Sequence, residues 1–306
     1  MQPNLKLGLA TAIGAQVLWG VFPAYIRLFN DVIAPFDFVA HRAIWAFVSL
    51  AIWQLLASRL RRHDGAVESS IRSRLFGDSK TIGTAILAAA LIATNWLVFV
   101  WAVSNDHYVD ASLGYYICPQ LVVLLGVVFL RERLTSLQWT AVGLATIGVL
   151  IMTLSGQSKV WIGLLVAIAF ALYALVKKKT HLSAVEGLTL ETGFMILPAI
   201  TFLVWRSAAD GATIFPASVS MTLLLLCCGF FTIAPLLLYA VAVKHIKLST
   251  VGLLQFIGPT IQFFLGVFAF AEPVDGTRIF GFVFVWIGVS VFLFAMHRGS
   301  VAAESQ

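Results

Sequence analysis

Charged residues are scarce in this chain, and their scarcity excludes most soluble folds. Only 11% of its 306 residues are charged and 60% are hydrophobic, whereas a soluble domain carries about 25% charged residues. A core that faces water on all sides cannot bury so much apolar surface. The apolar residues form long runs free of charge, which indicates helices that span a membrane.

Cysteine and catalytic motifs are also sparse. The three cysteines, Cys118, Cys227 and Cys228, lie in apolar runs without ligand spacing, so neither disulfides nor a metal site is expected. The motifs G-x-x-x-x-G-K-[ST], H-E-x-x-H and G-x-S-x-G are absent, which argues against an ATP motor and the common hydrolases. The sequence therefore predicts a protein that is not an enzyme and needs no cofactor.

Ten apolar runs of about 20 residues dominate the sequence, and each has the length of a membrane-spanning helix. They predict an all-α membrane protein of ten transmembrane helices. The helices are expected over residues 7–28, 36–58, 81–104, 109–130, 136–154, 160–177, 184–204, 218–242, 248–270 and 278–296. The hydrophilic segment 58–80 between the second and third helices is interpreted as a loop that fixes topology.

The basic residues are distributed one-sidedly between these helices. With the N-terminus inside, 15 of the 20 lysines and arginines lie on the cytoplasmic side, four lie outside, and Arg42 lies within a span. Because Lys and Arg near span ends resist translocation, both termini are predicted to be cytoplasmic, in the inner (plasma) membrane. Topology thus explains the net charge of +6, and no nucleic-acid partner is expected.

An internal repeat relates the two halves of the chain. The segment YICPQLVVLLGVVFLRE, ending at Glu132, aligns with FIGPTIQFFLGVFAFAE, ending at Glu272, and Pro119 matches Pro259. Five helices per half is an odd number, so residues 1–155 and 156–306 are predicted to form an inverted-topology repeat, as in many secondary transporters. The two prolines are predicted to kink their helices and act as gating points, with simple packing kinks as the alternative.

Several short motifs occur in an order that resembles a known family. They include Trp19-Gly20, His41-Arg42, Asn95-Trp96, Glu191-Thr192 and Gly258-Pro259-Thr260. The chain resembles the EamA-type members of the drug/metabolite transporter superfamily, and among them the RarD-type proteins. The resemblance implies two inverted five-helix halves around a central cavity, and transport or efflux of metabolites or drugs.

Ionisable side chains inside a membrane are rare and usually functional. Arg42, His41 and Glu191 are interpreted as a charged cluster that orients an ionic substrate or passes protons. A permanent pairing of Arg42 with Asp37 or Glu191, which would only tie helices together, is the equally supported alternative.

Other polar and aromatic residues are candidates for a substrate cavity. The amides can bind a solute or join helices, and the aromatic rings can line a pocket or form an interfacial belt. Trp96 and Trp101 are five residues apart, so at most one of them is expected to face the cavity. The remaining candidates are Trp19, Asn95, Tyr115, Gln120, Tyr239 and Gln255.

The predicted function is a secondary transporter that exports or exchanges a small metabolite or amphipathic compound by alternating access. Its partners would be that solute, the lipid bilayer and, in one version of the hypothesis, protons. The sequence specifies no oligomeric state. A polytopic membrane enzyme, with His41, Asp110 and Glu191 as acid and base, or a non-transporting sensor stays open as an alternative.

Overall fold

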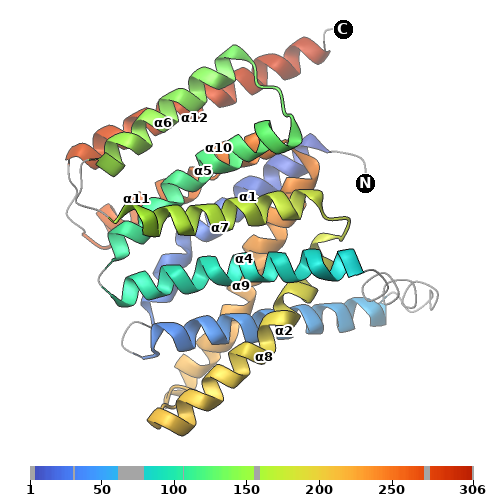
Figure 1. Ribbon diagram of the computed structural model, residues 1–306, viewed down its shortest axis with the longest axis vertical. Helices are drawn as coiled ribbons and strands as arrows, with labels where there is room; N and C mark the ends of the chain where they lie inside the picture. Colours follow the sequence, from blue (N-terminus) through green and yellow to red (C-terminus); the bar gives the residue numbers. More distant parts are fainter. Residues whose placement is uncertain are drawn as a thin grey trace.

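In the computed structural model, the chain forms a bundle of ten helices long and apolar enough to cross a membrane (Figure 1). The structure describes residues 4–29, 32–60, 79–105, 107–154, 159–271 and 276–304. Within those ranges it is helical and contains no strand, so the predicted ten-helix all-α architecture is confirmed. The elements are α1 (Leu5–Arg27), α2 (Pro35–Leu60), α4 (Ser79–Ser104), α5 (Tyr108–Leu130), α6 (Ser136–Leu154), α7 (Val160–Lys179), α8 (Ala184–Asp210), α9 (Val219–His245), α10 (Leu248–Leu254), α11 (Ile257–Phe264), the π-helical η1 (Leu265–Ala269) and α12 (Gly276–Glu304). Glu272 and most of segment 58–80 lie outside the described residues.

Local capping explains several of the helix ends. The Asn4 side chain accepts a hydrogen bond from the backbone N–H of Leu7 and starts α1. At the start of α8, Ser183 and Glu186 bond reciprocally to each other's backbone N–H groups and form a capping box. These bonds satisfy donors that an α-helix leaves free in its first turn.

The ninth span is interrupted, although the sequence predicts one continuous helix over 248–270. The helix stops at Leu254 and resumes at Ile257. Gln255, the first residue of the break, lies four residues before Pro259, and Ile257 lies two residues before it. Proline lacks an N–H and its ring collides with the carbonyl four residues earlier, here that of Gln255. Pro259 therefore accounts for the break, whereas α5 continues through Pro119 as one helix.

Most of the packing joins helices from different halves of the chain (Figure 1). The second, fourth and fifth spans of the first half pack on the second, fourth and fifth spans of the second half, giving the pairs α2 with α8, α5 with α10, and α6 with α12. Further extensive contacts between the halves are those of α5 with α7, α1 with α9, α4 with α7 and α2 with α9. The halves are thus interlocked, with α6 and α12 at one end of the bundle and α2 and α8 at the other (Figure 1).

Glycines allow two of these helix pairs to approach closely. A Cβ added at Gly148 of α6 would collide with the carbonyl oxygen of Gly281 on α12, and one at Gly229 of α9 would collide with that of Trp45 on α2. Small residues at such crossings are typical of membrane bundles, where van der Waals packing replaces the hydrophobic effect between helices.

Candidate functional site

Arg42 lies in the second turn of α2, at a point where four helices meet. Its Nε donates a hydrogen bond to Thr232 Oγ1 of α9 at 3.2 Å. The guanidinium carbon lies 4.3 Å from the ring centroid of Trp96 on α4 and 4.8 Å from that of Phe22 on α1. The negative faces of both rings attract the cation, so two cation–π contacts hold the guanidinium in place.

No carboxylate of the described residues pairs with Arg42. Asp37, one predicted partner, instead meets Arg206 of α8, with 3.4 Å between Asp37 Oδ2 and Arg206 Nη2. Arg206 also approaches Asp210 at 3.7 Å. The predicted pairing of Arg42 with Asp37 is therefore wrong, because Arg206 from the antiparallel helix takes that carboxylate.

Glu191, the other predicted partner of Arg42, is neutralised by residues that the sequence analysis missed. Its Oε1 accepts from Lys177 Nζ at 2.7 Å and its Oε2 from the Tyr173 hydroxyl at 3.0 Å. Lys177 and Glu191 are only 1% and 3% exposed, which makes this a buried ion pair between α7 and α8. A paired and hydrogen-bonded carboxylate of this kind satisfies the requirement for burying a charge.

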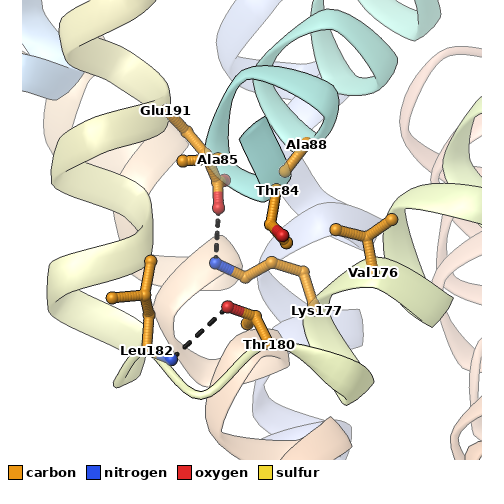
Figure 2. A pocket seen from close by; sticks show the side chains of 8 residues that line it. All are labelled: Thr84, Ala85, Ala88, Val176, Lys177, Thr180, Leu182 and Glu191. Atoms are coloured by element: carbon orange, nitrogen blue, oxygen red, sulfur yellow. Dashed lines mark hydrogen bonds and ion pairs between the residues drawn. The ribbon is translucent and has the colours of Figure 1, made fainter. Parts of the chain in front are cut away.

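The ion pair borders a narrow crevice between three helices. Figure 2 shows Glu191 from α8 and Lys177 from α7 pointing toward each other beside Thr84 and Ala88 of α4. About 160 Å³ of space not filled by atoms, part of it open to the outside, lies in the crevice. Its lining is made by Thr84, Ala85, Ala88, Val176, Lys177, Thr180, Leu182 and Glu191.

Arg42 and Glu191 lie far apart because α2 and α8 run antiparallel. Asp37 meets Arg206 at one end of the helix pair, and Gln54 bonds Thr189 at the other. Glu191 is about 22 Å along α8 from Arg206, whereas Arg42 is only about 8 Å along α2 from Asp37, at 1.5 Å per residue. The predicted cluster of Arg42, His41 and Glu191 is therefore wrong.

His41 has both ring nitrogens occupied. Its Nε2 lies 2.8 Å from the carbonyl oxygen of Ile214, which can only accept, and its Nδ1 accepts from Trp45 Nε1 at 3.2 Å. These partners define a neutral ring protonated at Nε2. With 1% exposure, His41 ties α2 to the segment after α8.

A second polar group lies in the middle of the bundle and draws on both halves. Gln255, at the break after α10, donates from Nε2 to the Tyr239 hydroxyl at 2.8 Å, and the Cys118 thiol contacts Gln255 Oε1 at 3.8 Å. The Tyr239 ring packs against Trp19 and Phe170 at centroid distances of 5.4 Å each. We refer to Trp19, Phe170 and Tyr239 as the aromatic box.

The aromatic box connects to the buried ion pair along one face of α7. Phe170 lies 5.8 Å from Tyr173, centroid to centroid, and Tyr173 donates to Glu191. Phe170, Tyr173 and Lys177 follow the i, i+3, i+7 spacing of a single helix face. That spacing is the sequence signal by which these three residues could have been found.

The other candidates separate into interior and peripheral positions. Trp96 is buried beside Arg42, whereas Trp101 is exposed and packs near Trp161, so the two do not share a face. Asn95 donates to the Val166 carbonyl at 2.9 Å and ties α4 to α7. Gln120 has both amide atoms buried without a hydrogen-bond partner among described residues.

The candidate Tyr115 and the nearby Glu132 have mainly structural contacts. Tyr115 packs against Phe99, with 5.4 Å between ring centroids. Glu132 accepts from the backbone N–H groups of Leu248 and Ser249 at 2.6 and 2.9 Å, and from the Ser249 hydroxyl. Glu132 thus caps α10 across the two halves.

Comparisons with known proteins identify what this architecture resembles. The sequence profile of the EamA-like transporter family matches residues 6–154 and 157–294. The chain is 38% identical to "Uncharacterized transporter YojE" of Bacillus subtilis over 312 residues, covering 98% of each chain. It is 36% identical to "Protein RarD" of Escherichia coli over 288 residues, covering 94% of each chain. A solved structure titled "Crystal structure of protein" superposes with a TM-score of 0.70 at 16% identity, covering 94% of this chain and 98% of the other.

Proposed function

The chain belongs to the EamA-like transporter family, and from this premise we propose that it is a secondary transporter that works by alternating access. It would export or exchange a small metabolite or amphipathic compound across the inner membrane, with both termini in the cytoplasm. Residues 1–155 and 156–306 would be its two inverted halves.

The observation that carries this proposal is the exchange of helix contacts between the halves. Corresponding helices pair with each other, and the contact of α1 with α9 matches that of α4 with α7. Two equivalent halves can in principle adopt each other's conformation, which moves an opening from one side of the membrane to the other. The interrupted ninth span near Pro259 would supply a bending point for that change.

The aromatic box and its neighbours are the proposed position of the solute. Trp19 and Cys118 come from the first half, and Phe170, Tyr239 and Gln255 come from the second. A site shared by both halves would be exposed alternately as they rearrange. Apolar faces with few polar groups suit an amphipathic compound.

Uptake into proteoliposomes tests the proposal. The purified protein is reconstituted and screened against amino acids, metabolites and amphipathic drugs, with and without an imposed pH gradient. Movement of a solute that falls at least tenfold in W19L, but stays at the wild-type rate in W161L, supports transport through the aromatic box. Trp161 is the matched control because it is exposed at the start of α7.

A proton-coupled mechanism makes a separate prediction. Glu191 is the ionisable group that connects to the aromatic box through Tyr173 and Phe170. If it carries the proton, the response to a pH gradient disappears in E191Q while exchange of solute persists. Unchanged gradient dependence in that variant would remove Glu191 from this role.

The alternative functions predict the absence of solute movement. A folded protein that moves no solute in either direction would favour a membrane enzyme or a sensor over a transporter. Within the described residues, no group of three or more His, Cys, Asp or Glu is placed to hold a metal.

A further inference from the structure

Arg42 differs from four other described cations within or near the spans, each of which has a carboxylate or a backbone carbonyl oxygen as its partner. Lys177 pairs with Glu191, and Arg206 pairs with Asp37. Lys178 and Lys244 donate to the carbonyl oxygens of Ile246 and Thr180. Arg42 has a hydroxyl and two ring faces but no acidic partner among described residues. A charge in hydrocarbon is costly, so an uncompensated one indicates a function.

The contacts of Arg42 leave one edge of its guanidinium unused. Thr232 takes the Nε–H, while Phe22 and Trp96 lie against the planar group. The two terminal nitrogens have no acceptor in the described part of the chain. In the described part of the chain, the buried side-chain nitrogens and oxygens that lack a hydrogen-bond partner belong to Asp37, Gln120 and Arg206, and none belongs to Arg42. The terminal nitrogens therefore carry accessible surface, although the groups around them are buried.

That free edge has the chemistry of a carboxylate receptor. Two terminal nitrogens of a guanidinium form a planar fork that matches both oxygens of a carboxylate. The ring contacts and the bond to Thr232 hold the fork in place before any ligand arrives, which reduces the entropy lost on binding. A single guanidinium balances one negative charge, so a monoanion fits better than a phosphate dianion.

The aromatic box lies further along two of the helices that hold Arg42, α1 and α9. Trp19 is one turn from Phe22 on α1, and Tyr239 is two turns from Thr232 on α9. Seven residues of helix span about 10 Å, which is the length of a small aromatic acid. A flat apolar body attached to the carboxylate would match this separation between Arg42 and the box.

We propose that Arg42 binds the carboxylate of the transported solute, and that this solute is a monoanionic carboxylic acid with a flat apolar body. The assignment rests on the proposed transport function, which it deepens by naming a class of substrate. The charge of Arg42 is then balanced by the solute.

Binding measured without transport tests the assignment. The probes are 3-phenylpropionate, its neutral amide, 3-phenylpropylamine and 2-phenylethylphosphonate, each titrated calorimetrically into purified wild-type protein in detergent. The carboxylate is expected to bind at least tenfold more tightly than any other probe. Equal affinity for carboxylate and amide, or a preference for the amine or the phosphonate, would overturn the proposal.

Variants locate the preference on the chain. In R42M the preference for carboxylate over amide is expected to vanish, and R42K is expected to retain part of it because the charge remains but the fork is lost. R27M is the control, since Arg27 also lies over a ring, that of Phe270, but is exposed at the end of α1. A carboxylate preference that survives in R42M would place the anion site elsewhere.

The binding result and the transport result can fail separately. Carboxylate binding that depends on Arg42, without any movement in proteoliposomes, would uphold the anion site and refute the transporter. Movement of solutes whose rate does not change in R42M would uphold the transporter and refute the anion site. The wild-type probe comparison stands even if R42M does not fold.

Discussion

Arg42 and Glu191 occupy equivalent positions, since each is the eighth residue of its helix, yet their surroundings differ completely. Glu191 has a lysine and a tyrosine as partners inside the protein, whereas Arg42 has no acidic partner in the residues described. The protein completes the site around Glu191 by itself. The site around Arg42 is left with binding capacity for something else.

Removing one partner of the Glu191 pair should give the largest effect. K177M leaves a buried carboxylate without its cation, which is expected to lower the free energy of unfolding by about 3–5 kcal/mol. Unfolding by SDS in mixed micelles measures the loss. The double variant K177M/E191L should recover most of it, and a single variant as stable as wild type would contradict a buried pair.

The Tyr173 hydroxyl should matter less than the lysine. Y173F removes one hydrogen bond to a charged group, so a loss of about 1.5–3 kcal/mol is expected by the same measurement. Y25F serves as its control, because the Tyr25 hydroxyl donates to a neutral acceptor, the carbonyl oxygen of Leu224, and a smaller loss is expected there. An equal effect of both variants would argue against a specific role for the Tyr173 bond.

On the Arg42 side, the hydroxyl of Thr232 should contribute a smaller amount. T232V keeps the shape of the side chain but removes the acceptor for Nε, at an expected cost of about 1 kcal/mol. If R42M is already present, adding T232V should change nothing further. Additive losses in the double variant would mean that Thr232 stabilises the protein independently of Arg42.

Replacing Arg42 itself should have the smallest effect on stability. R42M loses two cation–π contacts but also removes an unpaired charge from the membrane interior, so a net change below about 1 kcal/mol is expected. A loss as large as that of K177M would mean that Arg42 is a structural residue with a hidden partner. That outcome would erase the contrast between the two sites.

Sequence patterns predicted the architecture well but misplaced the charged cluster. Ten apolar runs are enough to define ten spans, because lipid requires every spanning segment to satisfy its own backbone. The prediction that Arg42 pairs with Glu191 was wrong because the same position in two antiparallel helices lies toward opposite ends of the helix pair. The inverted repeat predicted from the sequence implies the same separation, so the two predictions were inconsistent with each other.

The sequence analysis did not identify the partners of Glu191, for a different reason. Lys177 is the first of three consecutive lysines at the end of a span, which is the ordinary pattern of a topology signal. Only its position on α7 distinguishes it, since Lys177 is buried whereas Lys178 is half-buried and Lys179 is exposed. The sequence predicted a kink at Pro259 but not the break in the ninth span, because the same loss of a backbone hydrogen bond leaves α5 continuous at Pro119.

The interlocking of the two halves has a consequence for biosynthesis. Helices α2, α5 and α6 have their main packing partners, α8, α7 and α12, in the second half of the chain, which is made last. At about 5–20 residues per second, the second half needs roughly 8–30 s of synthesis. During that interval only lipid, or a membrane chaperone, can cover the surfaces of the inserted first helices on which helices of the second half will later pack.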